Sequence, residues 1–95
     1  MNKIGFFERQ NVYRKALNQF GAEAQVIVAI EEMSEVTKEL CKLQRGLGDR
    51  EHLAEEIADA TIMLEQMRMM FNVNTLVCTK MDEKISRLER RVMQK

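Results

Sequence analysis

The chain has no proline, and glycine occurs only four times in its 95 residues. Both residues interrupt helices, whereas the Glu, Lys, Arg, Leu, Met and Ala that are common in this sequence favour them. Long stretches of the chain can therefore continue as helix over many turns. This scarcity of helix breakers predicts an all-α fold.

Four helical segments are predicted from the positions of the glycines and of the polar residues that cap helices. Gly21 and Gly46 act as stop signals, and Asp49 and Asn74 are the expected N-caps of the segments that follow them. No linker or internal repeat divides the chain, so we expect residues 1–95 to form one small domain. The expected helices cover residues 3–20, 22–45, 50–71 and 74–94.

The charge balance and the distribution of apolar residues limit the classes of function. Fifteen basic and fifteen acidic side chains give a formal net charge of zero, so no overall field favours nucleic acid or an anionic membrane. No apolar run is long enough to span a bilayer, and the first residues lack the apolar core of a signal peptide. Cys41 and Cys78 are isolated thiols, so we expect free cysteines in a cytoplasmic protein.

Eight methionines, many of them at helix-face positions, make the apolar stripes wide for one thin bundle. Small helical chains bury only a limited fraction of their surface. We therefore expect self-association, as a dimer or a tetramer, that completes a four-helix bundle.

Two acidic pairs with i, i+3 spacing lie on the two middle segments. In EEMSE, Glu32 and Glu35 lie over adjacent turns beside an apolar face; in EEIAD, Glu56 lies inside such a face and Asp59 on its border. If the two helices pack as an antiparallel pair, the four carboxylates converge. The apolar faces are formed by Val26, Ala29, Ile30, Met33, Val36, Leu40 and Leu43, and by Leu53, Ile57, Ala60, Leu64, Met67 and Phe71.

Converging carboxylates that lose their water bind either protons or a cation, because desolvation and like charge both oppose ionisation. All-oxygen ligands favour a hard cation, Mg²⁺ or Mn²⁺, over zinc. The alternative is a solvated helix face, which a single ExxE pattern usually is, but two such pairs on consecutive helices favour the metal site. A di-iron centre is excluded because His52, the only histidine, is not three residues after a Glu.

The two acidic motifs resemble the EExxE…ExxD signature of the MazG-like all-α nucleoside triphosphate pyrophosphohydrolases. The stretches FGAEAQVIVAIEEMSEVTKEL, HLAEEIADATIMLEQM and KISRLERR are also similar to this family, over about residues 18–91. The resemblance implies a Mg²⁺-dependent enzyme that hydrolyses (d)NTPs to (d)NMPs and pyrophosphate, as a house-cleaning activity of the nucleotide pool. It also implies a homo-oligomeric bundle, because related enzymes often build the site between subunits.

The resemblance further implies roles for individual acids. Glu32, Glu35, Glu56 and Asp59 occupy the family's Mg²⁺-ligand positions. Glu31 occupies the leading position of the double Glu, where it would orient water or act in the outer coordination sphere. A carboxylate near the ion can accept the proton of the attacking water, so Glu31, Glu32 and Glu35 are the predicted catalytic residues.

The last segment has a row of basic side chains. Lys80, Lys84, Arg87 and Arg91 follow i, i+4, i+7, i+11 spacing beside an apolar stripe of Val77, Met81, Ile85, Leu88 and Val92. Taken alone, such a row is more often a solvated flank, but opposite a Mg²⁺ site it could bind phosphates, with Arg as a bidentate fork. KISR resembles the family's KxxR element, which implies that Lys84 and Arg87, with Lys80 beside them, bind phosphate. LERR departs from the family pattern, so no role follows for Arg91.

Three further residues are candidates for contacts with the substrate. By the resemblance, Phe20 lies at a position that is commonly aromatic and Gln25 at a Gln before the double Glu, and both would contact the nucleoside. The alternatives are a core role for Phe20 and a surface role for Gln25. His52 lies near Glu56 by helical spacing, where it either contacts substrate or a metal-bound water, or faces solvent.

A function of another class is also consistent with the sequence. Met-rich helix faces and a neutral charge suit a non-catalytic interaction or regulatory module that retains the acidic cluster. The presence of all four acids at ligand positions favours the enzyme. Stabilisation of the fold by Mg²⁺ or Mn²⁺ distinguishes the two.

Overall fold

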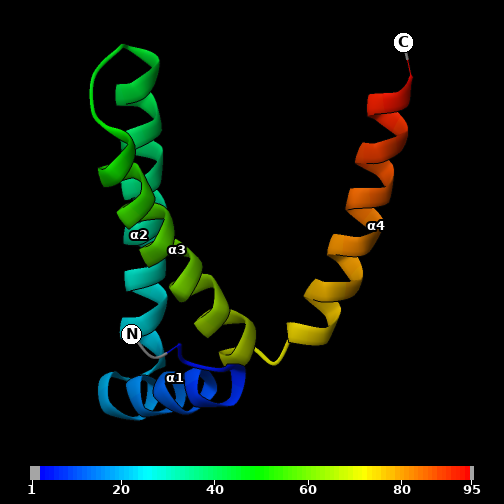
Figure 1. Ribbon diagram of the computed structural model, residues 1–95. Helices are drawn as coiled ribbons and strands as arrows, with labels where there is room; N and C mark the ends of the chain where they lie inside the picture. Colours follow the sequence, from blue (N-terminus) through cyan, green and yellow to red (C-terminus); the bar gives the residue numbers. More distant parts are fainter. Residues whose placement is uncertain (1–2, 95) are drawn as a thin grey trace.

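The computed structural model describes residues 3–94, which form four α-helices and no strand (Figure 1). The predicted all-α fold is confirmed. None of these helices is long and apolar enough to cross a lipid bilayer. Cys41 and Cys78 are both free, as expected. The helices are α1 Phe6–Phe20, α2 Ala22–Gln44, α3 Arg50–Met70 and α4 Asn74–Met93.

Glycines and one capping aspartate set the boundaries between the first three helices. α1 ends at Gly21, and the loop after α2 contains Gly46 and Gly48; all three have positive φ angles, of 86°, 76° and 77°. Glycine adopts this left-handed conformation without the steric cost that a Cβ would add. Asp49 caps α3, since its carboxylate accepts a hydrogen bond of 2.8 Å from the backbone N–H of His52. The predicted Asp49 cap is confirmed.

Two helix starts differ from the prediction. α1 begins at Phe6, three residues later than expected, because the backbone at Gly5 is extended. The predicted Asn74 cap is wrong: α4 begins at Asn74 itself, after a left-handed turn at Asn72 with φ 55°. The side-chain oxygen of Asn74 instead accepts a hydrogen bond of 2.8 Å from Nε of Arg68.

α2 and α3 form an antiparallel hairpin, and α1 crosses one end of it (Figure 1). α4 diverges from this hairpin and, within residues 3–94, contacts α3 near their connection but neither of the other helices. One chain alone therefore does not close the expected four-helix bundle.

The contact between α2 and α3, here called the α2–α3 seam, contains charged and polar side chains. A set of shielded positions repeats at intervals of three and four residues in both helices, as expected where one face of each helix lies against the other; residues 26, 42, 65, 66, 68 and 69 are shielded as well. Two predicted ligands, Glu32 of α2 and Glu56 of α3, belong to this set. The seam positions are Gln25, Ala29, Glu32, Val36, Glu39 and Leu43 in α2, and Leu53, Glu56, Ala60, Met63, Met67 and Met70 in α3.

The expected apolar faces are only partly buried. Ile30, Met33 and Leu40 of α2 are 56%, 42% and 49% exposed, and Ile57 and Leu64 of α3 are 45% and 47% exposed. The helices are rotated so that these side chains flank the seam while acidic residues enter it. Within one chain these five side chains are therefore not part of the core.

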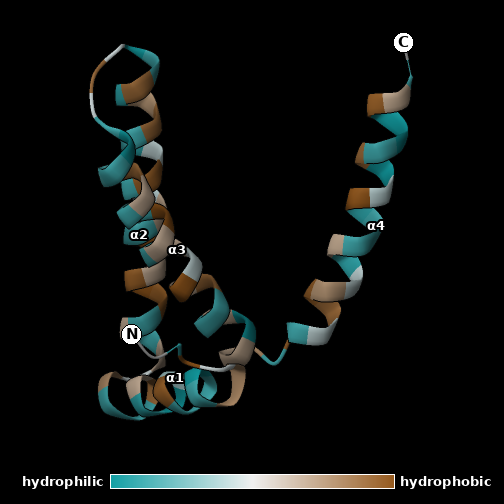
Figure 2. Cartoon of the chain, in the orientation of Figure 1, coloured by the Kyte–Doolittle hydropathy of each residue, from teal (hydrophilic) through white to brown (hydrophobic). Residues whose placement is uncertain are grey.

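α4 is amphipathic but has no partner along most of its length. Figure 2 shows hydrophobic stretches that recur along the ribbon of α4 between hydrophilic ones, and no α4 residue is buried in the described part of the chain. Met81, Ile85, Leu88 and Val92 are between 48% and 71% exposed. We call these four residues, with Val77, the α4 apolar stripe.

Candidate metal centre

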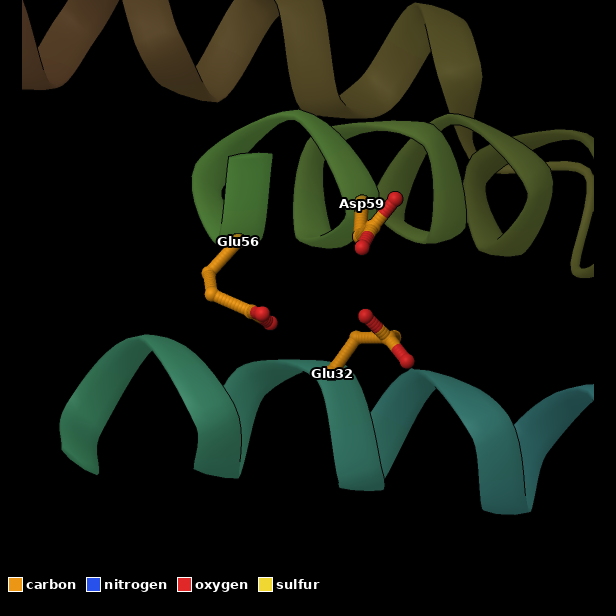
Figure 3. A group of neighbouring side chains, drawn as sticks. All are labelled: Glu32, Glu56 and Asp59. Carbon is orange, nitrogen blue, oxygen red and sulfur yellow. The ribbon is translucent and has the colours of Figure 1, made fainter. Parts of the chain in front are cut away.

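Three carboxylates from α2 and α3 converge in the middle of the seam (Figure 3). Glu56 and Asp59 point from α3 toward Glu32 of α2, and one oxygen of each residue lies within 4.8 Å of the other two. The i, i+3 spacing places Glu56 and Asp59 on one side of α3, and the packing of the hairpin brings Glu32 opposite them. The structure thus groups three of the four predicted ligand positions.

The electrostatics of this cluster disfavour three ionised carboxylates without a cation. Partial burial raises the pKa of Glu32 above its ordinary value, and the nearby charges of Asp59 and Glu56 raise the same pKa further. A hydrogen bond to Asp59 and the charge of Glu35 act in the same direction. Within residues 3–94, no basic side chain forms an ion pair with Glu32 or with Asp59.

The two other predicted acids of α2 lie outside the cluster. Glu35 is exposed and is not among the three grouped carboxylates, although its charge acts on Glu32. Glu31 is exposed as well. Helical geometry explains both positions, because residues 31 and 35 are four apart and lie on the same flank of α2, turned away from the seam that contains Glu32.

Apolar side chains surround the acids on one side. Glu32 and Asp59 line a depression of about 230 Å³ together with Val28, Ile62 and Met63. A ligand that reached the carboxylates there would also contact apolar surface. The depression therefore suits a ligand that has both charged and apolar parts.

A larger cavity, of about 580 Å³, lies between α1 and α3 and shares Ile62 with the depression at the acids. Its polar lining is one cluster, in which the hydroxyl of Tyr13 donates a hydrogen bond to Glu65 and Nη1 of Arg9 lies 3.4 Å from the same carboxylate. Burial, then the hydrogen bond and the charge of Glu65, raise the pKa of Tyr13 to about 12. This cluster fastens α1 to α3.

A second charged network adjoins the cluster at the loop end of the hairpin. Glu39 is only 2% exposed, with Nζ of Lys42 at 3.2 Å and Nδ1 of His52 at 3.3 Å from its oxygens. Nε2 of His52 lies 3.4 Å from Oε1 of Glu56. A buried carboxylate without such partners would cost several kcal/mol.

The contact between His52 and Glu39 is absent from the sequence prediction. Helical spacing indicated the proximity of His52 to Glu56 but not its contact with Glu39. The available signal was the seven-residue interval from Glu32 to Glu39, which returns to the same face of α2 after two turns. That interval places Glu39 in the seam together with Glu32.

The predicted phosphate-binding side chains are not beside the acids of the same chain. Lys80, Lys84 and Arg87 are exposed on α4, which diverges from the hairpin (Figure 1). Lys80 forms an ion pair of 3.6 Å with Glu83 on its own helix. Any phosphate contact made jointly by these cations and the acids therefore requires another arrangement of α4 or another chain.

The two predicted nucleoside-binding residues occupy different environments. Phe20 is 58% exposed at the end of α1, so it is not a core residue within this chain. Gln25 is 6% exposed in the α2–α3 seam, so the alternative of a surface polar group is wrong. Gln25 lies on the same face of α2 as Glu32, two turns before it.

Comparison with known proteins gives no relative for this site: no protein-family model, curated protein or solved structure matches the chain. Its function is therefore argued from the geometry and charge of its own residues. The three grouped carboxylates, with their hard oxygen donors, are the feature that most limits the chemistry.

Proposed function

We propose that the protein is a cytoplasmic, Mg²⁺-dependent nucleoside triphosphate pyrophosphohydrolase that converts (d)NTPs to (d)NMPs and pyrophosphate, in the manner of the MazG-like family that its acidic motifs resemble. The observation that carries the proposal is the convergence of Glu32, Glu56 and Asp59 from two helices. The crowding of these carboxylates raises the pKa of Glu32, and a divalent cation would offset the repulsion between their charges.

The donor set fits Mg²⁺ or Mn²⁺. One oxygen of each of the three carboxylates lies within 4.8 Å of the other two, so small side-chain movements would bring all three onto one cation. All the donors are hard oxygens, and none of the three residues is a His or Cys that would favour zinc. Glu32, Glu56 and Asp59 would hold the ion, and Glu35 would approach it by a side-chain rotation.

Mg²⁺, when bound, supplies a Lewis acid that polarises phosphate oxygens and lowers the pKa of water. The chain's own residues would then position the substrate and move a proton. Glu31 and Glu35, exposed on one flank of α2, are available to orient the attacking water and to accept its proton. The apolar side chains beside the acids would exclude water from part of the nucleotide.

A second copy of the chain is part of this proposal, because one chain leaves both its basic row and its apolar stripe uncovered. α2 and α3 together have ten acidic and four basic side chains, a net charge of −6, whereas α4 has five basic and three acidic ones, a net charge of +2. α4 from a second copy would match the hairpin in both charge and exposed apolar surface. That arrangement would bring Lys84 and Arg87 toward the acids, where they could bind phosphate.

A screen for pyrophosphate release over canonical and modified (d)NTPs tests the enzyme proposal directly. We expect release of pyrophosphate, not orthophosphate, that depends on Mg²⁺. Glu56→Gln removes a charge at nearly constant volume and should abolish turnover without unfolding the chain. Glu55→Gln removes the same charge from an exposed neighbour on α3 and should leave turnover intact. Full activity of Glu56→Gln would overturn the ligand assignment.

The exposed α4 apolar stripe also fits the alternative of a non-catalytic interaction module. The two functions differ in their response to metal. An enzyme with this centre should melt at a higher temperature in Mg²⁺ or Mn²⁺. The free energy of unfolding should rise by about 2.7 kcal/mol when the ion is present at 100 times its dissociation constant. No stabilisation by either ion, together with no hydrolysis, would favour the interaction module.

A further inference from the structure

Glu39 and His52 lie outside the three-carboxylate cluster, yet both are fixed in place from several directions. Glu39 is the largest fully buried side chain of the described residues, and it faces Lys42 and His52 inside the α2–α3 seam. A charged group buried this deeply is retained only with close partners. One of its partners, His52, also contacts Glu56 of the proposed metal centre.

The loop between α2 and α3 builds this arrangement. Gly48 lies so close to the seam that a Cβ on it would be 3.4 Å from Cβ of Lys42 and 3.8 Å from Oε1 of Glu39. Its φ of 77° lets the loop close over Glu39, and Asp49 then starts α3 by capping the backbone N–H of His52. The imidazole of His52 is thereby placed over Glu39 at the first turn of α3.

His52 connects the buried carboxylate to one of the three grouped acids. Its Nδ1 lies 3.3 Å from Glu39 and its Nε2 lies 3.4 Å from Oε1 of Glu56, four residues along the same helix. Both ring nitrogens are therefore occupied by carboxylates, and Lys42 occupies the other side of Glu39. This occupancy argues against a second metal site at His52, because neither nitrogen is directed at open space.

We propose that Glu39 and His52 are positioning residues, which hold the carboxylate of Glu56 in the orientation that faces Glu32 and Asp59. The proposal rests on the proposed metal centre. Groups that contact a metal ligand from behind fix its orientation, and their loss typically weakens metal binding about 10–100-fold. Glu39 acts through His52 and contacts neither the metal nor the substrate.

Binding of Mn²⁺ to the full chain, followed by the electron paramagnetic resonance signal of the free ion, tests the proposal. Asparagine at position 52 places its amide nitrogen near Nδ1, where only Glu39 is in reach. Glutamine at position 52 places its amide nitrogen near Nε2, where Glu56 is in reach. His52→Gln should therefore keep the contact that matters, and His52→Asn should lose it.

We expect the Mn²⁺ dissociation constant to rise about tenfold or more in His52→Asn, which loses the contact with Glu56. It should rise less, about threefold, in His52→Gln and in Glu39→Gln, which keep that contact but lose the ion pair between Glu39 and residue 52. Glu51→Gln, an exposed charge removal beside His52, is the matched control and should bind like the wild type. Melting without metal accompanies each titration. A merely structural network predicts equal Mn²⁺ affinities for His52→Gln and His52→Asn at equal stability, and that result would overturn the proposal.

The same titration separates this proposal from the one on which it rests. If the wild type binds Mn²⁺ and releases pyrophosphate while Glu39→Gln and His52→Asn bind the ion equally well, only the positioning role is wrong. If the wild type binds no Mn²⁺, the metal centre is wrong and the positioning role falls with it. Unfolding of Glu39→Gln without metal leaves the decision to the two His52 variants.

Discussion

The α2–α3 hairpin buries polar side chains, whereas α4 exposes apolar ones. The hairpin places Gln25, Glu39 and Gln66 among its most buried residues, whereas α4 leaves Ile85 and Leu88 more than half exposed. Each arrangement alone runs against the usual distribution of residues between core and surface. The two are explained together if the hairpin is organised around a charged site and α4 is organised to cover another surface.

This comparison indicates that one chain holds only part of its core. α4 has 20 residues and, of the helices described, contacts only α3, near their connection, whereas most helices in proteins owe their stability to the packing of an amphipathic face. The exposed flanks of the hairpin, including Ile30 and Leu40, offer apolar surface of the same kind. Self-association would bury both surfaces, and the predictions below test each side of the comparison.

The largest effect is expected from a charge placed in the α4 apolar stripe. Ile85→Asp would have to bury a carboxylate at the interface between copies, so the dissociation constant of the oligomer should rise about 100-fold or more, roughly 2.8 kcal/mol. Sedimentation at several protein concentrations measures it. Ser86→Asp adds the same charge one residue along and off the stripe, and it should associate like the wild type. A wild type that is monomeric at every concentration would contradict the assignment of the stripe.

The next effect concerns the charged centre of the hairpin. Glu32→Gln removes one of three crowded carboxylates, so the metal-free chain should gain stability, on the order of 1 kcal/mol. The same variant should lose the stabilisation by Mg²⁺, which in the wild type is about 2.7 kcal/mol at 100 times the dissociation constant. Thermal melting with and without Mg²⁺ measures both changes. A metal-free Glu32→Gln that melts below the wild type would show that the carboxylates are not in conflict.

The elements that could be predicted from the sequence are those that depend on a few neighbouring residues. Gly21 and Gly46 end helices because they adopt positive φ angles, and Asp49 caps α3 through its own first turn. The grouping of Glu56 and Asp59 on one side of α3 follows from their spacing alone. These features need no knowledge of how the helices pack.

The elements that could not be predicted depend on packing between helices. α2 has apolar residues over a broad arc, so several faces could have been buried, and the face that packs on α3 contains Glu39 instead of Leu40. A turn at Asn72 could be predicted, because Asn tolerates the left-handed conformation that it adopts, but the direction that α4 takes after this turn could not. Together these two outcomes explain why the acids converge within one chain while the basic row of α4 does not lie beside them.

A third prediction tests how closely the two helices of the hairpin approach. Ala29 is 2% exposed in the seam, so Ala29→Leu would force α2 away from α3 and should destabilise the chain by about 1–3 kcal/mol. A domain of this size should then melt several degrees lower, at roughly 4–8 °C per kcal/mol. Ala24→Leu makes the same change at an exposed position of α2 and should melt close to the wild type. Equal melting of the two variants would contradict the seam.

The smallest effect is expected where α1 is fastened to the hairpin, at Tyr13. Its pKa of about 12, against an ordinary 10.0, means that the folded chain holds this proton more tightly than the unfolded chain does. The contribution of Tyr13 to the free energy of unfolding should therefore be fully present and independent of pH below about 10.0, and should be lost as the pH rises from 10.0 toward about 12. Tyr13 is the only tyrosine, so the ultraviolet absorbance of tyrosinate reports on it alone. A folded-state titration midpoint at the ordinary value would contradict the contact with Glu65. Tyr13→Phe removes the hydroxyl and should lower the free energy of unfolding by about 1 kcal/mol.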